Sequence, residues 1–238
     1  MQLTEVAFRY HRKSPWVLRD VSFTLPAGVT EVTGRNGAGK STLLRLLAGL
    51  RSPTRGTITG RPARVGYAPE RFPVDQPFTV SAYLKHMAAI RGTAEASIAT
   101  WADRLRFDHL LNVKLPDLSK GSAQKVGLAQ ALMADPTLLI LDEPFAGLDA
   151  QTRDELPALI TDLADAGTTV VVSDHQRVIE AVPGITRVRI EEATLAQAIT
   201  ASDNAVMEGV LEVVVSVEDM EAVEAKLRAE GYEVRRPQ

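Results

Sequence analysis

The first quarter of the chain carries the hydrophobic patterns of several short strands and one helix. Residues 2–8 and 20–25 alternate apolar and polar side chains, as strands with one buried face do. A β-branched run at Val29–Thr33 leads directly into a glycine-rich turn, and the leucines of Ser41–Leu50 then recur with helical spacing on a face expected to be buried. Two further short strands, set off by glycine and proline, are expected at Gly56–Thr59 and Arg64–Ala68.

The pattern becomes helical between Pro77 and Pro116. Thr79 and Thr93 each precede an apolar run with helical spacing, so both are predicted to be N-caps. The side chains expected to be buried on these two helices are Val80, Leu84, Met87, Ile90, Ile98, Trp101 and Leu105. We interpret Met87 and Trp101 as core residues.

Two continuously apolar runs, Thr137–Leu141 and Thr168–Ser173, have the composition of strands buried on both faces of a parallel sheet. A helical pattern covers Asp154–Ala166 between them, and the polar turn Ser119–Ser122 opens another helix. The alternation of strands and helices predicts an α/β sandwich that is interrupted by a small helical insertion. Further along, residues 211–234 show a strand–helix–strand pattern.

Composition narrows the classes of function. With a net charge of −3 over 238 residues, the chain exerts no overall attraction on nucleic acid or on an anionic membrane. It has no cysteine, which excludes disulfides, thiolate metal sites and cysteine nucleophiles. No apolar run approaches the roughly 20 residues of a membrane helix, and the N-terminus has no apolar core of a signal peptide. Any role at a membrane is therefore expected to depend on a partner chain.

The glycine-rich turn, GRNGAGKS at residues 34–41, matches the pattern GxxxxGK[ST] at every fixed position. Its glycines let backbone N–H groups turn inward around an anion, and the following helix adds the positive end of its dipole. Lys40 is suited to the β- and γ-phosphates of a nucleotide, and the hydroxyl of Ser41 is suited to Mg²⁺. The turn lies between a predicted strand and a predicted helix, as this mechanism requires.

Two carboxylates follow the apolar strand that begins at Thr137. Ligands bind at this end of the strands in a parallel α/β sheet. Asp142 is suited to hold Mg²⁺ through its water shell, and Glu143 to polarise a water for in-line attack on the γ-phosphate. His175 follows the next buried strand on the same edge, where it could hydrogen-bond the γ-phosphate or the attacking water. We assign no role to His11, His86 and His109.

These motifs resemble those of the nucleotide-binding subunits of ABC transporters over residues 2–190. The phosphate loop GRNGAGKST, the strand LLILDEP, the turn Ala146–Asp149 and His175 follow in the family's order and spacing. Leu118–Ser122 stands where the family carries its LSGGQ signature. The resemblance implies a P-loop NTPase sandwich with a mainly parallel core sheet, an antiparallel β subdomain and a small helical insertion.

The resemblance also implies a domain organisation. The ATP-binding domain is expected to occupy residues 1–190, with the helical insertion at about 77–135. Residues 191–238 would form a C-terminal extension with the strand–helix–strand element.

The resemblance further implies which residues bind the nucleotide. In the phosphate loop they are Gly34, Asn36, Gly37, Ala38, Gly39, Lys40, Ser41 and Thr42. Tyr10 lies where the family stacks an aromatic ring on adenine, and Trp16 is the less favoured candidate. Two such domains are expected to pair head to tail, so that Ser119 and the Gly121 N–H face the γ-phosphate of the partner's ATP.

The chain departs from the family pattern at two places. Lys120 and Ser122 replace the first glycine and the glutamine of the signature, which adds a charge but removes the backbone freedom of glycine. Glu70 occupies the position of a glutamine that contacts Mg²⁺; a carboxylate can still ligate the ion. The change at Glu70 is similar to the exporter branch of the family and predicts export.

We therefore predict an ATPase that converts ATP and water to ADP and phosphate, with Mg²⁺ as cofactor, as the subunit of an ABC transporter. Transmembrane permease subunits and a second ATPase subunit, identical or different, are the expected partners, and no nucleic acid is expected. The chain would be cytoplasmic and peripheral on the inner face of the cell membrane. A soluble ABC-type ATPase acting on ribosomes or DNA is the first alternative, although such proteins usually carry tandem cassettes, a coiled coil or basic extensions. A regulatory module that binds ATP without turnover is the second; the presence of Glu143 argues against it.

Overall fold

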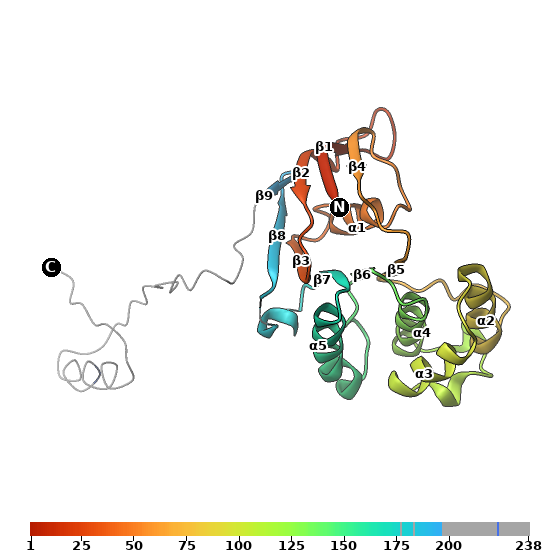
Figure 1. Ribbon diagram of the computed structural model, residues 1–238. Helices are drawn as coiled ribbons and strands as arrows, with labels where there is room; N and C mark the ends of the chain where they lie inside the picture. Colours follow the sequence, from red (N-terminus) through yellow and green to blue (C-terminus); the bar gives the residue numbers. More distant parts are fainter. Residues whose placement is uncertain (177, 183, 197–222, 224–238) are drawn as a thin grey trace. The chain divides into compact units, whose positions relative to one another are not determined.

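The computed structural model describes residues 1–176, 178–182, 184–196 and 223 (Figure 1). The chain divides into two compact units, Met1–Asp203 and Asn204–Gln238. All the strands and helices with described bounds belong to the first unit. The strand–helix–strand pattern predicted at residues 211–234 lies, apart from residue 223, outside the described residues.

A three-stranded antiparallel sheet with the order β2–β1–β4 lies at one end of the first unit (Figure 1). Its strands are β1 (Gln2–Phe8), β2 (Leu18–Thr24) and β4 (Arg55–Thr59). The register shifts between Leu3 and Val6 and again between Val6 and Phe8, so the predicted alternation of β1 holds only in part. The buried side chains of this sheet pack on the leucines of helix α1 (Lys40–Leu47).

Six strands form the core sheet in the order β5–β6–β7–β3–β8–β9. All neighbouring pairs are parallel except β8 and β9. The strands are β3 (Val29–Gly34), β5 (Val65–Ala68), β6 (Leu138–Asp142), β7 (Thr169–Ser173), β8 (Thr186–Glu191) and β9 (Thr194–Ala196). Every residue of β6 is buried, and so is most of β7, which accounts for their continuous apolar runs. The sequence analysis did not predict β8, although its arginines alternate with the buried Val188 and Ile190 as in a strand with one exposed face.

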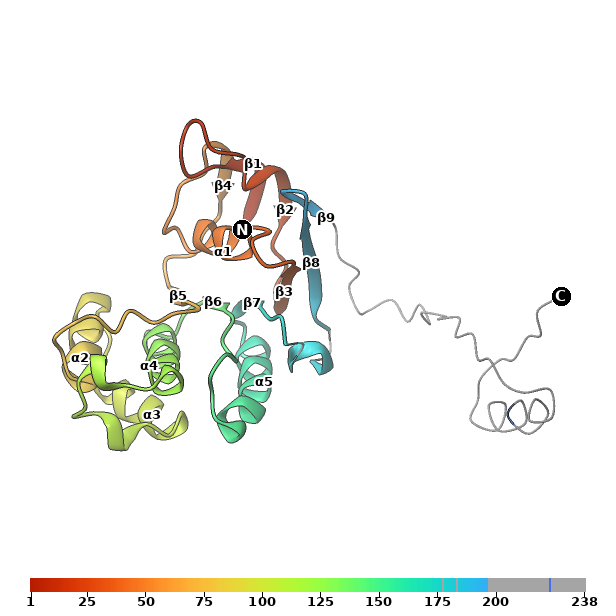
Figure 2. The same cartoon turned by 180° about the vertical axis from the view of Figure 1, so that it is seen from behind.

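Different elements cover the two faces of the core sheet (Figures 1 and 2). Helix α1 and the small sheet form one hydrophobic cluster with β3, β6 and β8, whereas α4 (Lys120–Leu132) and α5 (Ala150–Asp165) form the other. A helical segment continues the second cluster; it contains α2 (Val80–Arg91), α3 (Ala96–Arg104), η1 (Asp108–Leu110) and η2 (Leu115–Asp117). A last short turn, η3 (Val178–Ala181), follows β7. The predicted fold class is confirmed. Within the described residues, no helix has both the length and the apolar composition needed to cross a membrane.

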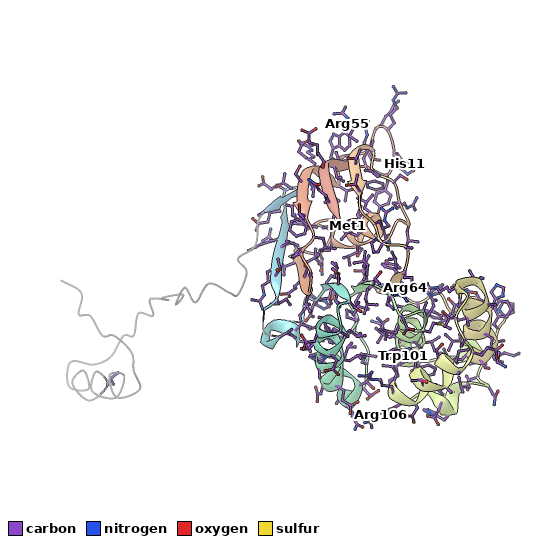
Figure 3. The ribbon with its side chains drawn as sticks, in the orientation of Figure 1. Met1, His11, Arg55, Arg64, Trp101 and Arg106 are labelled. Atoms are coloured by element: carbon purple, nitrogen blue, oxygen red, sulfur yellow. The ribbon has the colours of Figure 1, made fainter. Side chains whose placement is uncertain are left out.

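Several local predictions for the helices can be compared with the structure. Thr79 caps α2, since its side chain accepts the Ala82 N–H at 3.2 Å. Thr93 is not a cap, because α3 begins only after Glu95. Ile90 was predicted to be buried and is 65% exposed on the last turn of α2. Trp101 packs in the core of the helical segment as predicted (Figure 3).

Helix α4 touches neighbouring backbone directly near both of its ends. A Cβ atom on Gly66 of β5 would collide with the carbonyl oxygen of Ala131, near the end of α4. A Cβ atom on Gly121, at the start of α4, would likewise collide with the carbonyl oxygen of Gly147. Glycine at these two positions lets main chain pack on main chain.

Candidate functional site

The glycine-rich turn joins the end of β3 to the start of α1, as the sequence predicts. Gly34 has a φ of 144°, and a Cβ atom there would meet the carbonyl oxygen of Ile190 at 2.7 Å, so no other residue fits. Gly39 caps α1 with a φ of 110°. The side chain of Lys40 is buried, and its ammonium donates to the carbonyl of Gly34 at 3.0 Å. The ammonium is therefore held at the centre of the turn, close to the start of α1.

The carboxylate of Asp142 lies beside the start of α1. The hydroxyls of Ser41 and Ser173 donate to its Oδ1 atom at 3.1 Å and 2.9 Å, and the hydroxyl of Tyr67 donates to Oδ2 at 3.5 Å. Asp142 is fully buried, and this burial raises the pKa of its carboxyl, whereas the hydrogen bonds from the two serines lower it. The negative charge of Glu70 acts on the pKa of Asp142 in the same direction as burial.

The residues predicted to bind Mg²⁺ fit that ion. Asp142 and Glu70 supply carboxylate oxygens and Ser41 supplies a hydroxyl, which are the hard ligands that Mg²⁺ prefers. No group of three or more His, Cys, Asp or Glu side chains in the described part of the chain could hold a metal by itself. This sparse donor set is typical of Mg²⁺ sites that use one or two carboxylates, waters and the phosphates of a substrate.

Glu143 and His175 are in direct contact. The Nδ1 atom of His175 hydrogen-bonds Oε2 of Glu143, and the backbone N–H of His175 donates to the same oxygen at 3.2 Å. The other carboxylate oxygen, Oε1, lies 3.8 Å from the ammonium of Lys40. The Glu143 side chain is 11% exposed, whereas that of His175 is 52% exposed. The carboxylate thus connects the phosphate loop to the half-exposed histidine.

Tyr10 lies next to the phosphate loop, where the resemblance placed it. Its hydroxyl and that of Thr42 are 3.0 Å apart and hydrogen-bonded. Tyr10 and Trp16 both line a cleft of about 1180 Å³, together with residues 35–38 of the loop. The Trp16 ring is already covered by the guanidinium of Arg9, 4.5 Å from its centroid. Tyr10 is 44% exposed, so it is the better placed of the two rings to contact a base in this cleft.

Ser119 and Gly121 belong to a different part of the molecule from the phosphate loop. Ser119 caps α4, since its hydroxyl accepts the Ser122 N–H at 3.1 Å. Among the described residues, no hydrogen bond or ion pair joins Ser119 or Gly121 to the loop at 34–42. The stem of Lys120 lies over Gly147, where an added Cβ atom would be 3.3 Å away. The single chain therefore brings together Tyr10, the phosphate loop, Asp142, Glu143 and His175, but not Ser119 and Gly121.

Tyr67 and Ser173 contact the site but were not predicted from the sequence. Tyr67 lies on β5 and Ser173 ends β7, the strands on either side of β6. Burial raises the pKa of Tyr67, with a further rise caused by the charge of Asp142, so its phenol stays a hydrogen-bond donor. The only signal for Ser173 is its place at the end of an apolar strand, two residues before His175.

Comparison with known proteins connects this site to one family. Residues 18–146 match the family model described as ABC transporter. The zinc import ATP-binding protein ZnuC of Yersinia enterocolitica is 39% identical over 164 residues, which cover 67% of this chain and 64% of that protein. The chain therefore spans less than two thirds of this relative.

Solved structures share the fold. An ATP-binding subunit of an ABC transporter superposes with a TM-score of 0.76 at 26% identity, over 85% of this chain and 90% of that chain. The ATP-binding cassette MJ0796, in a dimeric post-hydrolysis state with ADP and Pi, superposes with a TM-score of 0.74 at 20% identity. That match covers 84% of this chain and 98% of the cassette.

Proposed function

Because the chain belongs to the ABC transporter family, we propose that it binds ATP with Mg²⁺, hydrolyses it to ADP and phosphate, and powers transport through separate membrane subunits. The convergence of two distant segments, residues 40–41 and 142–143, at one edge of the core sheet carries this proposal. The ammonium of Lys40 lies 3.8 Å from Glu143, and the hydroxyl of Ser41 lies 3.1 Å from Asp142. A phosphate anchor, a metal ligand and a base candidate are therefore neighbours, as phosphoryl transfer to water requires.

Binding of the triphosphate would use the backbone N–H groups of residues 34–42 and the ammonium of Lys40. Ser41 and Asp142 would hold Mg²⁺, with Glu70 as the further proposed ligand. When bound, the ion neutralises charge on the β- and γ-phosphate oxygens. The cleft beside Tyr10 would receive the adenosine, with the ring of Tyr10 against the base.

Glu143 is the proposed general base. An entering γ-phosphate would compete with Glu143 for the ammonium of Lys40, which would leave Oε1 available to accept a proton from water. His175 would keep Oε2 in place through its ring and backbone nitrogens. Because His175 is half exposed, the same imidazole could also reach a phosphate at the surface of the site.

We also propose that two ATPase subunits act together, head to tail. This is supported by the location of Ser119 and Gly121 on α4, apart from the phosphate loop of their own chain, and by the dimeric state of the MJ0796 cassette. In such a dimer, the start of α4 would face the γ-phosphate bound by the partner. Permease subunits would hold the pair at the inner face of a membrane.

The direction of transport is a separate question. The prediction of export came from Glu70 alone, and the relatives give it no support, since ZnuC is named as a zinc import protein. The charge of Glu70 acts on the pKa of Asp142, which bears on the metal site and not on the direction of transport. We therefore propose transport by a permease partner without retaining export as part of the proposal.

Two measurements test this function. Phosphate release by the purified chain is expected to need both ATP and Mg²⁺ and to cease with EDTA. Isolation from membranes is expected to retain a partner with several membrane-spanning helices. A chain that showed no affinity for Mg²⁺-ATP would contradict the proposal, whereas isolation without any membrane-spanning partner would favour a soluble ATPase.

A further inference from the structure

Ser173 occupies a position from which one hydroxyl contacts both acids of the site. It ends β7 and is fully buried. Its Oγ atom donates to Oδ1 of Asp142 at 2.9 Å and accepts the backbone N–H of Glu143 at 3.0 Å. A serine hydroxyl has one donor and two acceptor sites, so these two bonds can form at the same time.

The backbone of Glu143 needs such an anchor. Its φ is 51°, in the left-handed region that side-chain-bearing residues rarely adopt and that surrounding contacts must enforce. The N–H of Glu143 is held by Ser173 twice, through the hydroxyl and through the carbonyl at 3.2 Å. This backbone turn directs the Glu143 side chain to Lys40 and His175 instead of along the strand.

The carboxylate of Asp142 needs a second hydrogen-bond donor for a different reason. Its Oδ1 atom now accepts from Ser41 and Ser173, but Ser41 is the hydroxyl that would turn to the metal. The remaining contact, from Tyr67 to Oδ2, is long at 3.5 Å. Ser173 is therefore the donor that can keep Oδ1 in place after Ser41 has moved.

The location of Ser173 is itself fixed from both sides. In the parallel pair of β6 and β7, Ser173 is opposite Asp142. The next residue, Asp174, is 4% exposed, and its carboxylate accepts the N–H groups of Gln176, Val178 and Ile179. Neither the strand nor the turn that follows it can shift without the loss of several hydrogen bonds.

We propose that Ser173 is a positioning residue for ATP hydrolysis. Its single hydroxyl fixes the position of both the metal-binding carboxylate of Asp142 and the backbone of Glu143. It touches neither the nucleotide nor the metal and acts through those two residues. The inference rests on the proposed function. It goes beyond that function because it assigns a role to a residue outside the recognised motifs.

The test compares Ser173→Ala with Ser173→Thr, which restores a hydroxyl, and with Thr30→Val as a matched control. Thr30 is a fully buried residue of β3 in the same sheet, and its hydroxyl has no hydrogen-bond partner in the structure. Three quantities are measured: the affinity for Mn²⁺ by electron paramagnetic resonance in the presence of ADP, the affinity for a fluorescent ATP analogue in EDTA, and kcat with Mg²⁺-ATP.

Ser173→Ala is expected to weaken Mn²⁺ binding and to lower kcat by about tenfold or more, as loss of a hydrogen bond to a metal ligand does. Its nucleotide affinity in EDTA should stay within about twofold of the wild type, because the phosphate loop keeps its own contacts. Ser173→Thr should recover most of the Mn²⁺ affinity, and Thr30→Val should leave it unchanged. If Ser173→Ala does not fold, Ser173→Cys is used, which fills the volume but is a weak donor, and the same loss is expected.

Two results would overturn the inference. The first is a Ser173→Ala variant whose Mn²⁺ affinity and kcat equal those of the wild type. The second is a loss of nucleotide affinity that is the same in EDTA and with metal, as a merely structural role would give. Failure of the proposed function would look different. In that case the wild-type chain itself would bind no nucleotide, whatever residue stands at 173.

Discussion

Lys40 and Glu143 face each other at the edge of the core sheet, with the ammonium nitrogen 3.8 Å from a carboxylate oxygen. Their side chains are only 9% and 11% exposed, so solvent screens the attraction between the two charges only weakly. A triphosphate that enters the loop must draw Lys40 away from this pair. Changes at the two residues are therefore expected to affect different steps.

Lys40→Met should weaken nucleotide binding itself. The loss of charge-assisted hydrogen bonds to the phosphates, each worth about 1.5–3 kcal/mol, corresponds to about a 10- to 100-fold lower affinity. Isothermal titration with ATP checks this result. Lys85→Met is the control, because Lys85 pairs with Glu95 on the exposed surface. Equal ATP affinities for Lys40→Met and the wild type would show that Lys40 does not contact the phosphates.

Glu143→Gln should leave ATP bound but not hydrolysed. Removal of a general base costs about 10²- to 10⁴-fold in rate, while the amide keeps the shape of the side chain. Phosphate release and ATP affinity are measured on the same preparation. Glu155→Gln serves as the control. Glu155 lies on α5 and pairs with Arg106, which follows α3 (Figure 3). Undiminished phosphate release by Glu143→Gln would remove Glu143 from the role of base.

His175→Ala should slow hydrolysis much more than it weakens binding. The imidazole holds Oε2 of Glu143, and its loss leaves the carboxylate free to rotate. We expect kcat to fall by about 10- to 100-fold with little change in ATP affinity, the pattern of an interaction that matters in the transition state. His109→Ala, at an exposed position, provides the comparison. Parallel losses of kcat and of affinity would indicate that His175 is a structural residue.

Tyr10→Ala should weaken ATP binding through the base and not through the phosphates. A stacked aromatic ring contributes about 1–3 kcal/mol per base, so ATP affinity should fall by roughly tenfold. The affinity for inorganic tripolyphosphate, which lacks a base, should change far less. Trp16→Ala is the matched variant and should have the smaller effect, because Arg9 already covers that ring. The reverse order would assign the base contact to Trp16.

Lys125→Met should show a stability loss that depends on pH. Lys125 lies 2.6 Å from Asp149, and its hydrogen bond is the main cause that lowers the pKa of that carboxyl. A lowered pKa stabilises the folded protein above the ordinary aspartate pKa of about 3.9, and the contribution is lost as the pH falls through the lower folded value. Because Asp149 is half exposed, we expect a loss of about 1 kcal/mol at neutral pH. Urea unfolding at several pH values measures the free energy of unfolding of both proteins. The difference between the variant and the wild type should disappear below about pH 4.

The sequence predicted the parts of the site that are local in the chain. The glycine-rich turn, Asp142, Glu143 and His175 are each recognised from a short motif at the end of an apolar run, and the structure brings them together. Glu143 and His175 meet because the parallel strands β6 and β7 present their carboxyl ends at one edge. The roles of these residues in binding and catalysis stay predictions until they are measured.

The contacts made across strands could not be predicted. Ser173 and Tyr67 reach Asp142 only because β6 lies between β5 and β7 in a fixed register, which no local pattern encodes. The exposure of Ile90 was also not predicted. Hydrophobic periodicity indicates which face of a helix is buried, but not how far along the helix the segment that covers this face extends. Leu50 is 57% exposed for a related reason: α1 ends at Leu47, and Gly49 turns the chain with a φ of 78°.

The glycine contacts of α4 have a mechanical consequence. Near one end, Gly121 lies on Gly147, in the turn just after Glu143; near the other, Ala131 lies on Gly66, one residue before Tyr67 in β5. At both contacts backbone meets backbone, as in the close packing typical of protein interiors. Helix α4 is thus in direct backbone contact with neighbouring segments near both of its ends. A displacement of α4 would therefore reach both the turn after Glu143 and the strand that carries Tyr67.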